Sequence, residues 1–131
     1  MKIKKIIILA FFIALSFIGA NIKIAGSIAF DSTAGFLGTL IMGPFYGAVI
    51  GAFGHLLSAA ISGFPLSLPV HMIIMVDMAL TMFLFGITYK FFIKSNRLLA
   101  IIISSAAGVL INGPVSVFML VPIIGKAVLA M

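Results

Sequence analysis

The stretch TAGFLGTLIMGPFYGAVIGAFGHLLSAAIS, residues 33–62, is apolar along nearly its whole length and is interrupted near its middle. Gly43 and Pro44 stand at the interruption, and this dipeptide marks a tight turn. The turn divides the stretch into two helices, which we predict over about 32–43 and 45–62. Each is brief or tilted for a membrane span, because crossing the hydrocarbon takes roughly 20 residues.

The composition of the chain indicates lipid as its solvent. Apolar residues make up 64% of the 131 positions and charged residues 8%, whereas soluble domains have about 25% charged residues. Lipid cannot satisfy backbone groups, so spanning segments are helices or closed barrels. The apolar runs do not alternate as barrel strands do. We therefore predict an all-α, polytopic transmembrane helical bundle. The chain has no cysteine, which excludes disulfides and thiolate chemistry.

Further spans lie on both sides of this central stretch. The start MKIKK and the apolar run after it have the layout of a secretory signal. The segments that follow are themselves membrane helices, so we expect a retained first span at about 6–22. A polar link, KIAGSIAFDS, follows it. Pro65 and Pro69 break the helix before a fourth span at about 70–92, and a fifth runs from about 98 to 120.

The end of the sequence predicts an incomplete sixth helix. Pro122 and Gly125 indicate another turn, and residues 126–131 resemble the beginning of a helix. We expect a single transmembrane domain, residues 1–131, with five spans plus the start of a sixth, lacking the rest of the sixth helix.

The basic residues predict the orientation, because cytoplasmic loops hold an excess of Lys and Arg. With the N-terminus in the cytoplasm of a bacterial cell, six basic residues lie inside and two outside. The inner set is Lys2, Lys4, Lys5, Lys90, Lys94 and Arg97, and the outer set is Lys23 and Lys126. Because the positive charges sit at segment ends rather than in a stripe, they indicate topology and not nucleic-acid binding.

Rare polar residues fall in the outer half of the predicted bundle. An ionisable group inside a membrane is costly and is therefore a candidate functional residue. The set predicted to line a cup open to the outside is Asp31, His55, His71, Asp77 and Asn112.

Small and hydroxyl residues recur along two spans at spacings of three and four, which places each set on one helix face. The sets are Gly47, Gly51, His55, Ser58 and Ser62, and Ser104, Gly108, Asn112 and Ser116. Such stripes are also typical of packing seams between membrane helices. His55 and Asn112 can therefore serve a ligand or the packing, and a histidine there can simply donate to a neighbouring carbonyl.

Three further residues carry alternatives. Asp77 is predicted to be protonated or paired at its depth, with His55 and His71 as candidate partners, and Thr81 shares its face. It can hold a ligand or form a structural pair. Asp31 can bind a ligand or cap the next helix. Phe64, beside the polar mouth, is the aromatic residue expected to contact a ligand.

The order of short spans is similar to that of a known family. The strings GSIAFDSTAGFLGTLIMGPFYGAVIGAFGHLLSAAISGFPLSLPVH and SAAGVLINGPVSVF resemble substrate-binding S components of energy-coupling factor (ECF) transporters, over essentially the whole chain. The strings FDS, GPFYGAVIGAFGHLLSA and SGFPLSLPVH look most like the branch associated with cobalamin precursors, of the α-ribazole type.

The resemblance implies six helices and a pocket near the outer face, closed by the first and third outer loops. It also implies that the chain has no ATPase of its own, and we expect no enzymatic activity and no cofactor or metal. Energy would come from a transmembrane coupling subunit and two ABC ATPases, with Ala10 and Ala14 contacting the coupling subunit. The missing sixth helix departs from the family and puts independent function in doubt.

Other functions remain open at this point. The substrate can be another small vitamin, of the hydroxymethylpyrimidine, pantothenate or folate type. A membrane-embedded enzyme could use the two histidines and two aspartates, although no HExxH or comparable spacing occurs. An oligomeric channel or ion-coupled carrier could be built on the glycine seams, and a purely structural subunit would need none of these side chains.

Overall fold

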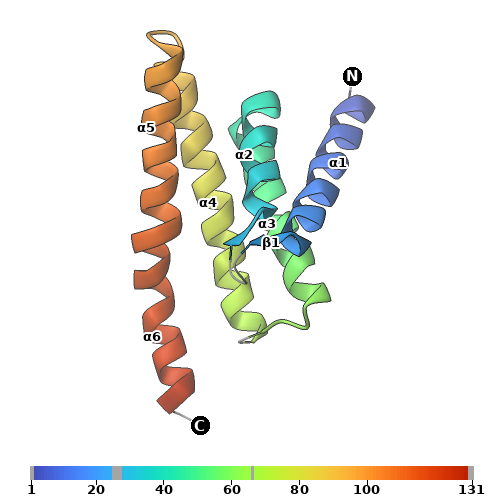
Figure 1. The fold of residues 1–131 in the computed structure, drawn as a ribbon, viewed down its shortest axis with the longest axis vertical. Helices are drawn as coiled ribbons and strands as arrows, with labels where there is room; N and C mark the ends of the chain where they lie inside the picture. Colours follow the sequence, from blue (N-terminus) through green and yellow to red (C-terminus); the bar gives the residue numbers. More distant parts are fainter. Residues whose placement is uncertain (1, 25–27, 66, 130–131) are drawn as a thin grey trace.

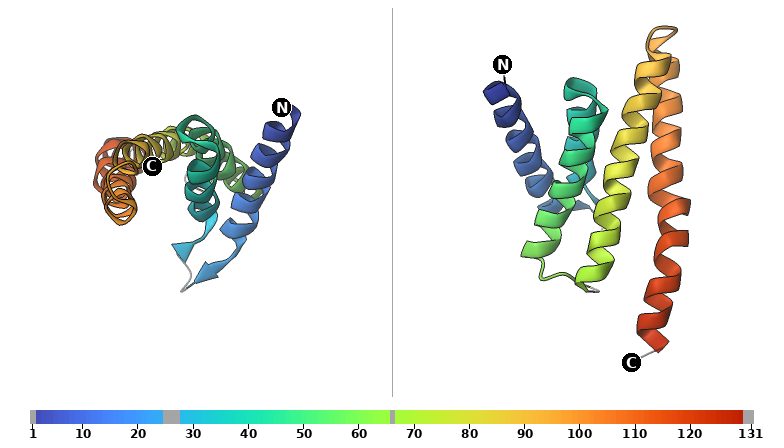
Figure 2. Two further views of the ribbon diagram at one scale, coloured as in Figure 1. Left: turned by 90° about the horizontal axis from the view of Figure 1, so that it is seen from above. Right: turned by 180° about the vertical axis from the view of Figure 1, so that it is seen from behind.

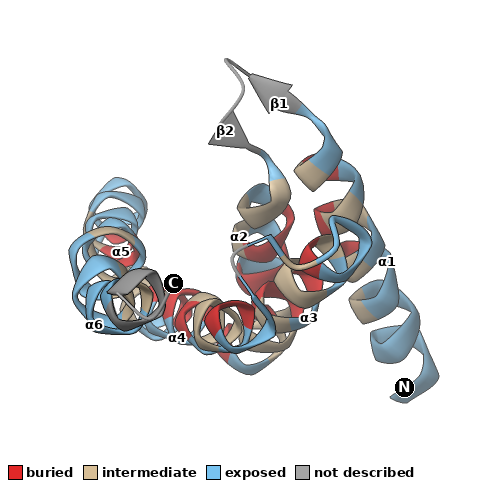
Figure 3. Cartoon of the chain, turned by 90° about the horizontal axis from the view of Figure 1, so that it is seen from below, coloured by how far each residue is buried: buried red, intermediate tan, exposed pale blue. Residues whose placement is uncertain are grey.

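The computed structural model describes residues 2–24, 28–65 and 67–129. Its helices follow one another around an arc, with α1 at one end and the α5–α6 rod at the other (Figures 1 and 3). The elements are α1 Lys2–Asn21, β1 Lys23–Ile24, β2 Ile28–Ala29, α2 Asp31–Met42, α3 Pro44–Ile61, α4 Leu68–Phe92, α5 Arg97–Leu110, the π-helix η1 Ile111–Val115 and α6 Ser116–Leu129.

The polar link after α1 forms a short hairpin. β1 and β2 pair antiparallel, with Lys23 opposite Ala29, and residues 25–27 of the link lie outside the described part. The hairpin returns the chain so that the end of α1 touches the start of α2. Gly19 makes this close approach possible, because a Cβ built there would lie 2.5 Å from the Phe30 carbonyl oxygen. The Ser16 hydroxyl also donates to the Asp31 carbonyl (2.7 Å).

The predicted turn between the second and third segments is confirmed. Gly43 has φ +98°, a conformation that glycine adopts readily, and α3 begins at Pro44, where a missing N–H costs nothing. The helices end and begin within about one residue of the predicted bounds. With 12 residues, α2 is about 18 Å long, which is shorter than the hydrocarbon core.

Glycines let α3 pack closely between α2, α4 and α1. A Cβ at Gly51 would lie 2.9 Å from the Met78 carbonyl oxygen of α4, and one at Gly54 would lie 2.7 Å from Ser16 Cβ of α1. A Cβ at Gly47 would collide with the Thr39 side chain of α2. The predicted glycine stripe of α3 is therefore a packing seam within this chain.

The link between α3 and α4 contains an unusual run of backbone conformations. Gly63, Phe64 and Ser67 all have positive φ, at +77°, +50° and +118°, and the last two are not glycine. The predicted helix-breaking role of Pro65 is not confirmed, because α3 ends at Ile61 and the Gly63 and Phe64 backbone N–H groups already donate to the Ala60 and Ala59 carbonyls. Pro69 lies in the first turn of α4, where proline is tolerated.

The C-terminal helices form one continuous rod, which corrects the prediction of a turn at Pro122 and Gly125. Helix α6 runs through both residues (Figure 1). Pro114 is accommodated by the π-helical turn. A proline removes a single N–H, whereas a turn inside lipid would leave several backbone groups unsatisfied, so the helix continues. Residues 126–129 thus extend α6 rather than start a sixth helix.

Four helical segments of the described residues are long and apolar enough to cross a membrane: Lys2–Asn21, Pro44–Ile61, Leu68–Phe92 and Arg97–Gly125. The predicted count of five spans and the start of a sixth is therefore not confirmed. The direction of the chain does alternate as predicted. The starts of α1 and α3 and the α4–α5 turn share one end, with the α3–α4 link at the other (Figures 1 and 2). The lysines at the start of α1 thus lie at the same end of the bundle as Lys90, Lys94 and Arg97.

Candidate functional site

Two histidines from neighbouring helices meet near the α3–α4 link. His55 Nε2 lies 3.2 Å from His71 Nδ1, and the two rings are tilted by 31° with centroids 5.4 Å apart. The seam that places Gly51 against α4 brings His55, one turn further along the same face, onto the first turn of α4. His71 is 8% exposed and His55 is half-buried, so His71 is the more shielded member of the pair.

The hydrogen-bond partners fix the proton positions of this pair when both imidazoles are neutral. His71 Nε2 lies 2.6 Å from the carbonyl oxygen of Pro65. Because a carbonyl can only accept, Nε2 carries the His71 proton, and Nδ1 is left as an acceptor. His55 Nε2 must then donate to it. The remaining nitrogen, His55 Nδ1, has no hydrogen bond within the described part of the chain and can accept one from a ligand.

A cleft lies beside His55, among the first four helices of the arc. Its lining comes from α1, α2, α3 and α4, and consists of Ser16, Asp31, Ser32, Gly51, His55, Met78 and Met82. Asp31 is the first residue of α2, and its Oδ1 accepts from the Ser32 backbone N–H (2.8 Å). The predicted cap role of Asp31 is not confirmed, because the cap position is Phe30 and α2 has no side-chain cap hydrogen bond. The Asp31 carboxylate lies instead in the first turn of the helix, where a negative charge is favourable, and it lines the cleft. The cleft is closed, since the space that it leaves for a water-sized group is about 0 Å³.

Asp77 has a different partner from the two histidines that the sequence suggested. The Ser116 hydroxyl of α6 donates to Asp77 Oδ2 at 2.5 Å. Asp77 is 1% exposed, and its second oxygen, Oδ1, has no hydrogen-bond partner among the described residues. A buried carboxylate oxygen without a donor is costly. Asp77 therefore retains the capacity to accept a hydrogen bond from a group that enters the bundle.

Two buried hydroxyls have the same unused capacity. Thr81 Oγ1, one turn after Asp77, and Ser58 Oγ of α3 are buried without a partner among the described residues. Thr81 was expected to share the face of Asp77, and its methyl group faces Gly108 of α5, where a Cβ would lie 3.9 Å from it. The described interior therefore offers several hydrogen-bonding atoms, most of them acceptors, that the fold itself leaves unused.

The other predicted site residues fall in three places. Phe64 packs beside the histidine pair, with its ring centroid 5.8 Å from that of His71. Asn112 lies in the π-helical turn and is exposed, so the structure does not bring it to the histidines. Ala10 and Ala14 are both exposed on α1. Within the described residues, no group of three or more His, Cys, Asp or Glu side chains is placed to hold a metal ion.

Sequence reasoning did not single out Ser116 as the partner of Asp77 or Pro65 as the carbonyl that orients His71. Ser116 belongs to the predicted stripe of the fifth span, so its inward position was foreseeable. The Pro65 carbonyl was not foreseeable, because a backbone acceptor leaves no trace in the residue type.

Comparisons with known proteins add one finding about the whole chain. A family model described as "ECF transporter, substrate-specific component" matches residues 4–131. No curated protein and no solved structure matches the chain.

Proposed function

Because the chain belongs to the ECF transporter substrate-specific component family, we propose that it captures a small vitamin-type molecule in the cleft beside His55. Components of this family are transport subunits, and they act with a transmembrane coupling subunit and ATPases. The observation that carries the proposal is the half-buried pair Asp31 and His55, which line one cleft together with the buried Ser16 in a bundle that is otherwise mostly apolar. Ionisable groups in a membrane domain are retained chiefly for function.

The chemistry of the site favours a ligand that donates hydrogen bonds. His55 and the Asp31 carboxylate are acceptors at the cleft, and Met78 and Met82 supply apolar contacts. Asp77 Oδ1 and Phe64 lie outside the cleft lining, and we propose that they also contact the ligand once the bundle opens. A flat base with hydroxyl groups fits this combination. Our first candidate is α-ribazole or a related cobalamin precursor, in which ribose hydroxyls would donate and the base would pack on apolar side chains. Vitamins of the hydroxymethylpyrimidine, pantothenate or folate type are the alternatives.

Binding requires a change of shape, because the cleft has no room for a ligand as it stands. Four different helices line it, so a ligand enters when α1 and α2 separate slightly from α3 and α4. The Pro65 carbonyl couples His71 to the α3–α4 link, and a displacement of the link therefore changes the orientation of the histidine pair.

The orientation and the partners belong to the same proposal. The basic end, with Lys2, Lys5 and Lys90, faces the cytoplasm of a bacterial cell by the positive-inside rule, so the histidine pair lies toward the outside. Ala10 and Ala14 form a small-residue strip on the exposed side of α1. Close helix contact in lipid needs such residues, and we assign this strip to the coupling subunit.

An oligomeric channel built on the glycine seams receives no support from the packing. Gly47, Gly51, Gly54 and Gly86 all face side chains or backbone of the same chain. These seams are already occupied and cannot hold a second copy.

The experiment is equilibrium binding of radiolabelled compounds to the detergent-purified chain. α-Ribazole is compared with hydroxymethylpyrimidine, pantothenate and folate, and a His55→Gln variant is measured beside a Lys94→Gln control at the opposite end. We expect saturable binding of one compound, weakened by His55→Gln and not by Lys94→Gln. Absence of binding to all four compounds, or equal binding by both variants, would contradict the proposal.

A further inference from the structure

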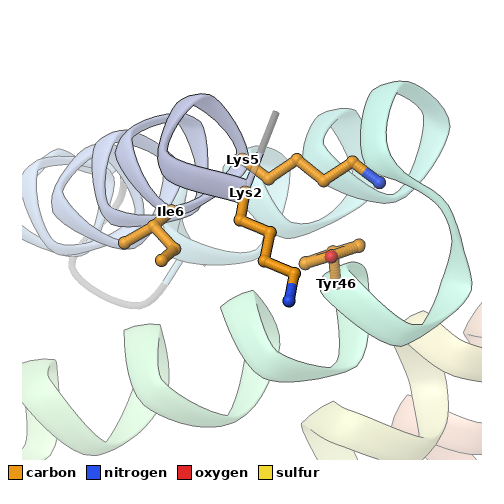
Figure 4. Close-up of a pocket in the computed structure, with 4 residues that line it drawn as sticks. All are labelled: Lys2, Lys5, Ile6 and Tyr46. Carbon is orange, nitrogen blue, oxygen red and sulfur yellow. The ribbon is translucent and has the colours of Figure 1, made fainter.

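A second cleft lies at the basic end of the bundle, far from the histidines. It is a cavity of about 490 Å³ between the first turns of α1 and α3, lined by Lys2, Lys5, Ile6 and Tyr46. Figure 4 shows the two lysine side chains extending from α1 on either side of the Tyr46 ring. Lys5 Nζ lies 5.7 Å from the centroid of that ring, so the aromatic face helps to position the ammonium group.

The positive charge of this cleft has no acidic counterpart in the chain. The sequence contains two acidic residues, Asp31 and Asp77. Asp31 begins α2 at the hairpin end, and Asp77 is bound to Ser116 inside the bundle. Neither reaches Lys2 or Lys5, and an ammonium group without a carboxylate partner is available to an anionic ligand.

Two helix N-termini add to the attraction for an anion. Helices α1 and α3 both begin at this end, and the N-terminus of a helix carries a partial positive charge and free N–H groups. The start of α3 has no side-chain cap. Lys90 also approaches from α4, since a Cβ at Gly43 would lie 3.4 Å from its Nζ. Lys90 does not line the cleft itself, but it adds positive charge beside the start of α3.

An apolar cavity continues from the basic cleft along the side of the bundle. It measures about 310 Å³ and is lined by Lys5, Ile8, Ile41, Met42 and Tyr46. Lys5 and Tyr46 are common to both cavities, so an anionic group between the lysines would be continuous with an apolar tail along Ile8 and Ile41. A soluble phosphate has no apolar part that could contact Ile8 and Ile41, so the second cavity favours a lipid over a free anion.

From this combination we propose that the Lys2–Lys5–Tyr46 cleft binds one anionic phospholipid. The phosphate lies between the Lys2 and Lys5 ammonium groups, and an acyl chain runs along Ile8, Ile41 and Met42. Basic clefts between membrane helices at the cytoplasmic surface are suited to anionic headgroups. The site is at the opposite end from the substrate cleft, so it does not depend on which molecule the protein transports.

The test is native mass spectrometry of the full chain in detergent with equal amounts of dioleoylphosphatidylglycerol and dioleoylphosphatidylcholine. These lipids have the same chains and differ in headgroup charge. One basic residue near an anionic headgroup contributes about a fivefold preference. The double variant Lys2→Gln, Lys5→Gln should therefore lower the preference for the anionic lipid by about 30-fold.

The matched control removes the same charge elsewhere. Lys94→Gln with Arg97→Gln changes the α4–α5 turn and the first residue of α5, outside both cavities. This variant should leave the preference within about twofold, because neither side chain lines the cleft and exposed charges are screened by salt. Ile41→Asn should weaken both lipids by spoiling the apolar cavity.

Three outcomes would overturn the proposal. The first is an equal loss of preference in the double variant and its control, which would mean unspecific attraction. The second is displacement of the lipid by an equal concentration of glycerol phosphate, which would indicate a site for free anions. The third is a double variant that keeps its lipid but no longer co-purifies with the coupling subunit, which would make the cleft a protein contact.

Discussion

Replacing Gly51 by alanine should separate α3 from α4 and disturb the site. The added Cβ would lie 2.8 Å from Met82 Cγ and 2.9 Å from the Met78 carbonyl oxygen. Carbon atoms pack best at about 3.5–4.0 Å, so Met82 would have to retreat by about 0.7 Å. Met82 is 0% exposed, and the carbonyl belongs to the helix backbone, so neither group can yield without moving α4.

The expected loss of stability follows from two opposing effects. Overpacking a closed core costs about 1–3 kcal/mol, and the upper half of that range applies here because a backbone atom must move. Alanine gains about 1 kcal/mol over glycine in a helix. The net loss is about 1–2 kcal/mol. Gly51 also lines the cleft one turn from His55, so ligand affinity should fall together with stability.

Gly125→Ala is the matched control for this variant. It makes the same chemical change in helix α6, where nothing lies within 4 Å of the added Cβ and the next residue is not proline, so its stability should equal or exceed that of the wild type by up to about 1 kcal/mol. Both variants would be compared by thermal unfolding in the same detergent. Equal midpoints for Gly51→Ala and Gly125→Ala would refute the packing of α3 against α4 on which the site depends.

Three further predictions concern the site, a helix cap and the topology. Asp77→Asn should keep the chain folded, because the amide oxygen can still accept from Ser116, yet it should weaken binding of the labelled ligand by about 10- to 100-fold through loss of the acceptor Oδ1; unchanged affinity would assign Asp77 a structural role. Asn96→Ala should lower stability by about 0.5–2 kcal/mol in chemical denaturation, since the Asn96 side chain accepts from the first backbone N–H groups of α5, and an unaltered midpoint would argue against this cap. Because the chain has no cysteine, Ser62→Cys should react with a membrane-impermeant maleimide on intact cells and Ser95→Cys should not, whereas the reverse pattern would invert the proposed orientation.

A helix boundary could be predicted where the glycine and proline that indicate a turn lie at an end of the bundle and not within the lipid. Gly43 and Pro44 stop one helix and start another because a positive φ and a missing N–H both fit a turn at the bundle surface. Pro114 and Pro122 carry a similar local signal but lie inside a helix. There, lipid penalises every unpaired backbone group, and a local defect is less costly than a turn. Residue type alone does not distinguish these cases.

Several residues of the candidate site could be predicted from the sequence, but the contacts between them could not. His55 and His71 stood out because ionisable side chains are rare in this chain, and the structure brings them together. The four-residue spacing placed Asn112 with Ser116, but the π-helical turn changes the angular step per residue. Ser116 consequently reaches Asp77, whereas Asn112 is exposed. A pairing across 39 positions depends on how two helices pack, which a single sequence does not reveal.

The rod formed by α5 and α6 is longer than the membrane that must hold it. Its apolar segment Arg97–Gly125 has 29 residues, a length of about 43 Å, against a hydrocarbon thickness of about 30 Å. This hydrophobic mismatch is relieved by leaning of the rod, by local thickening of the bilayer, or by both. A thinner bilayer therefore requires the rod to lean further or to deform the surrounding lipid more, so membrane thickness affects the energy of this edge of the bundle.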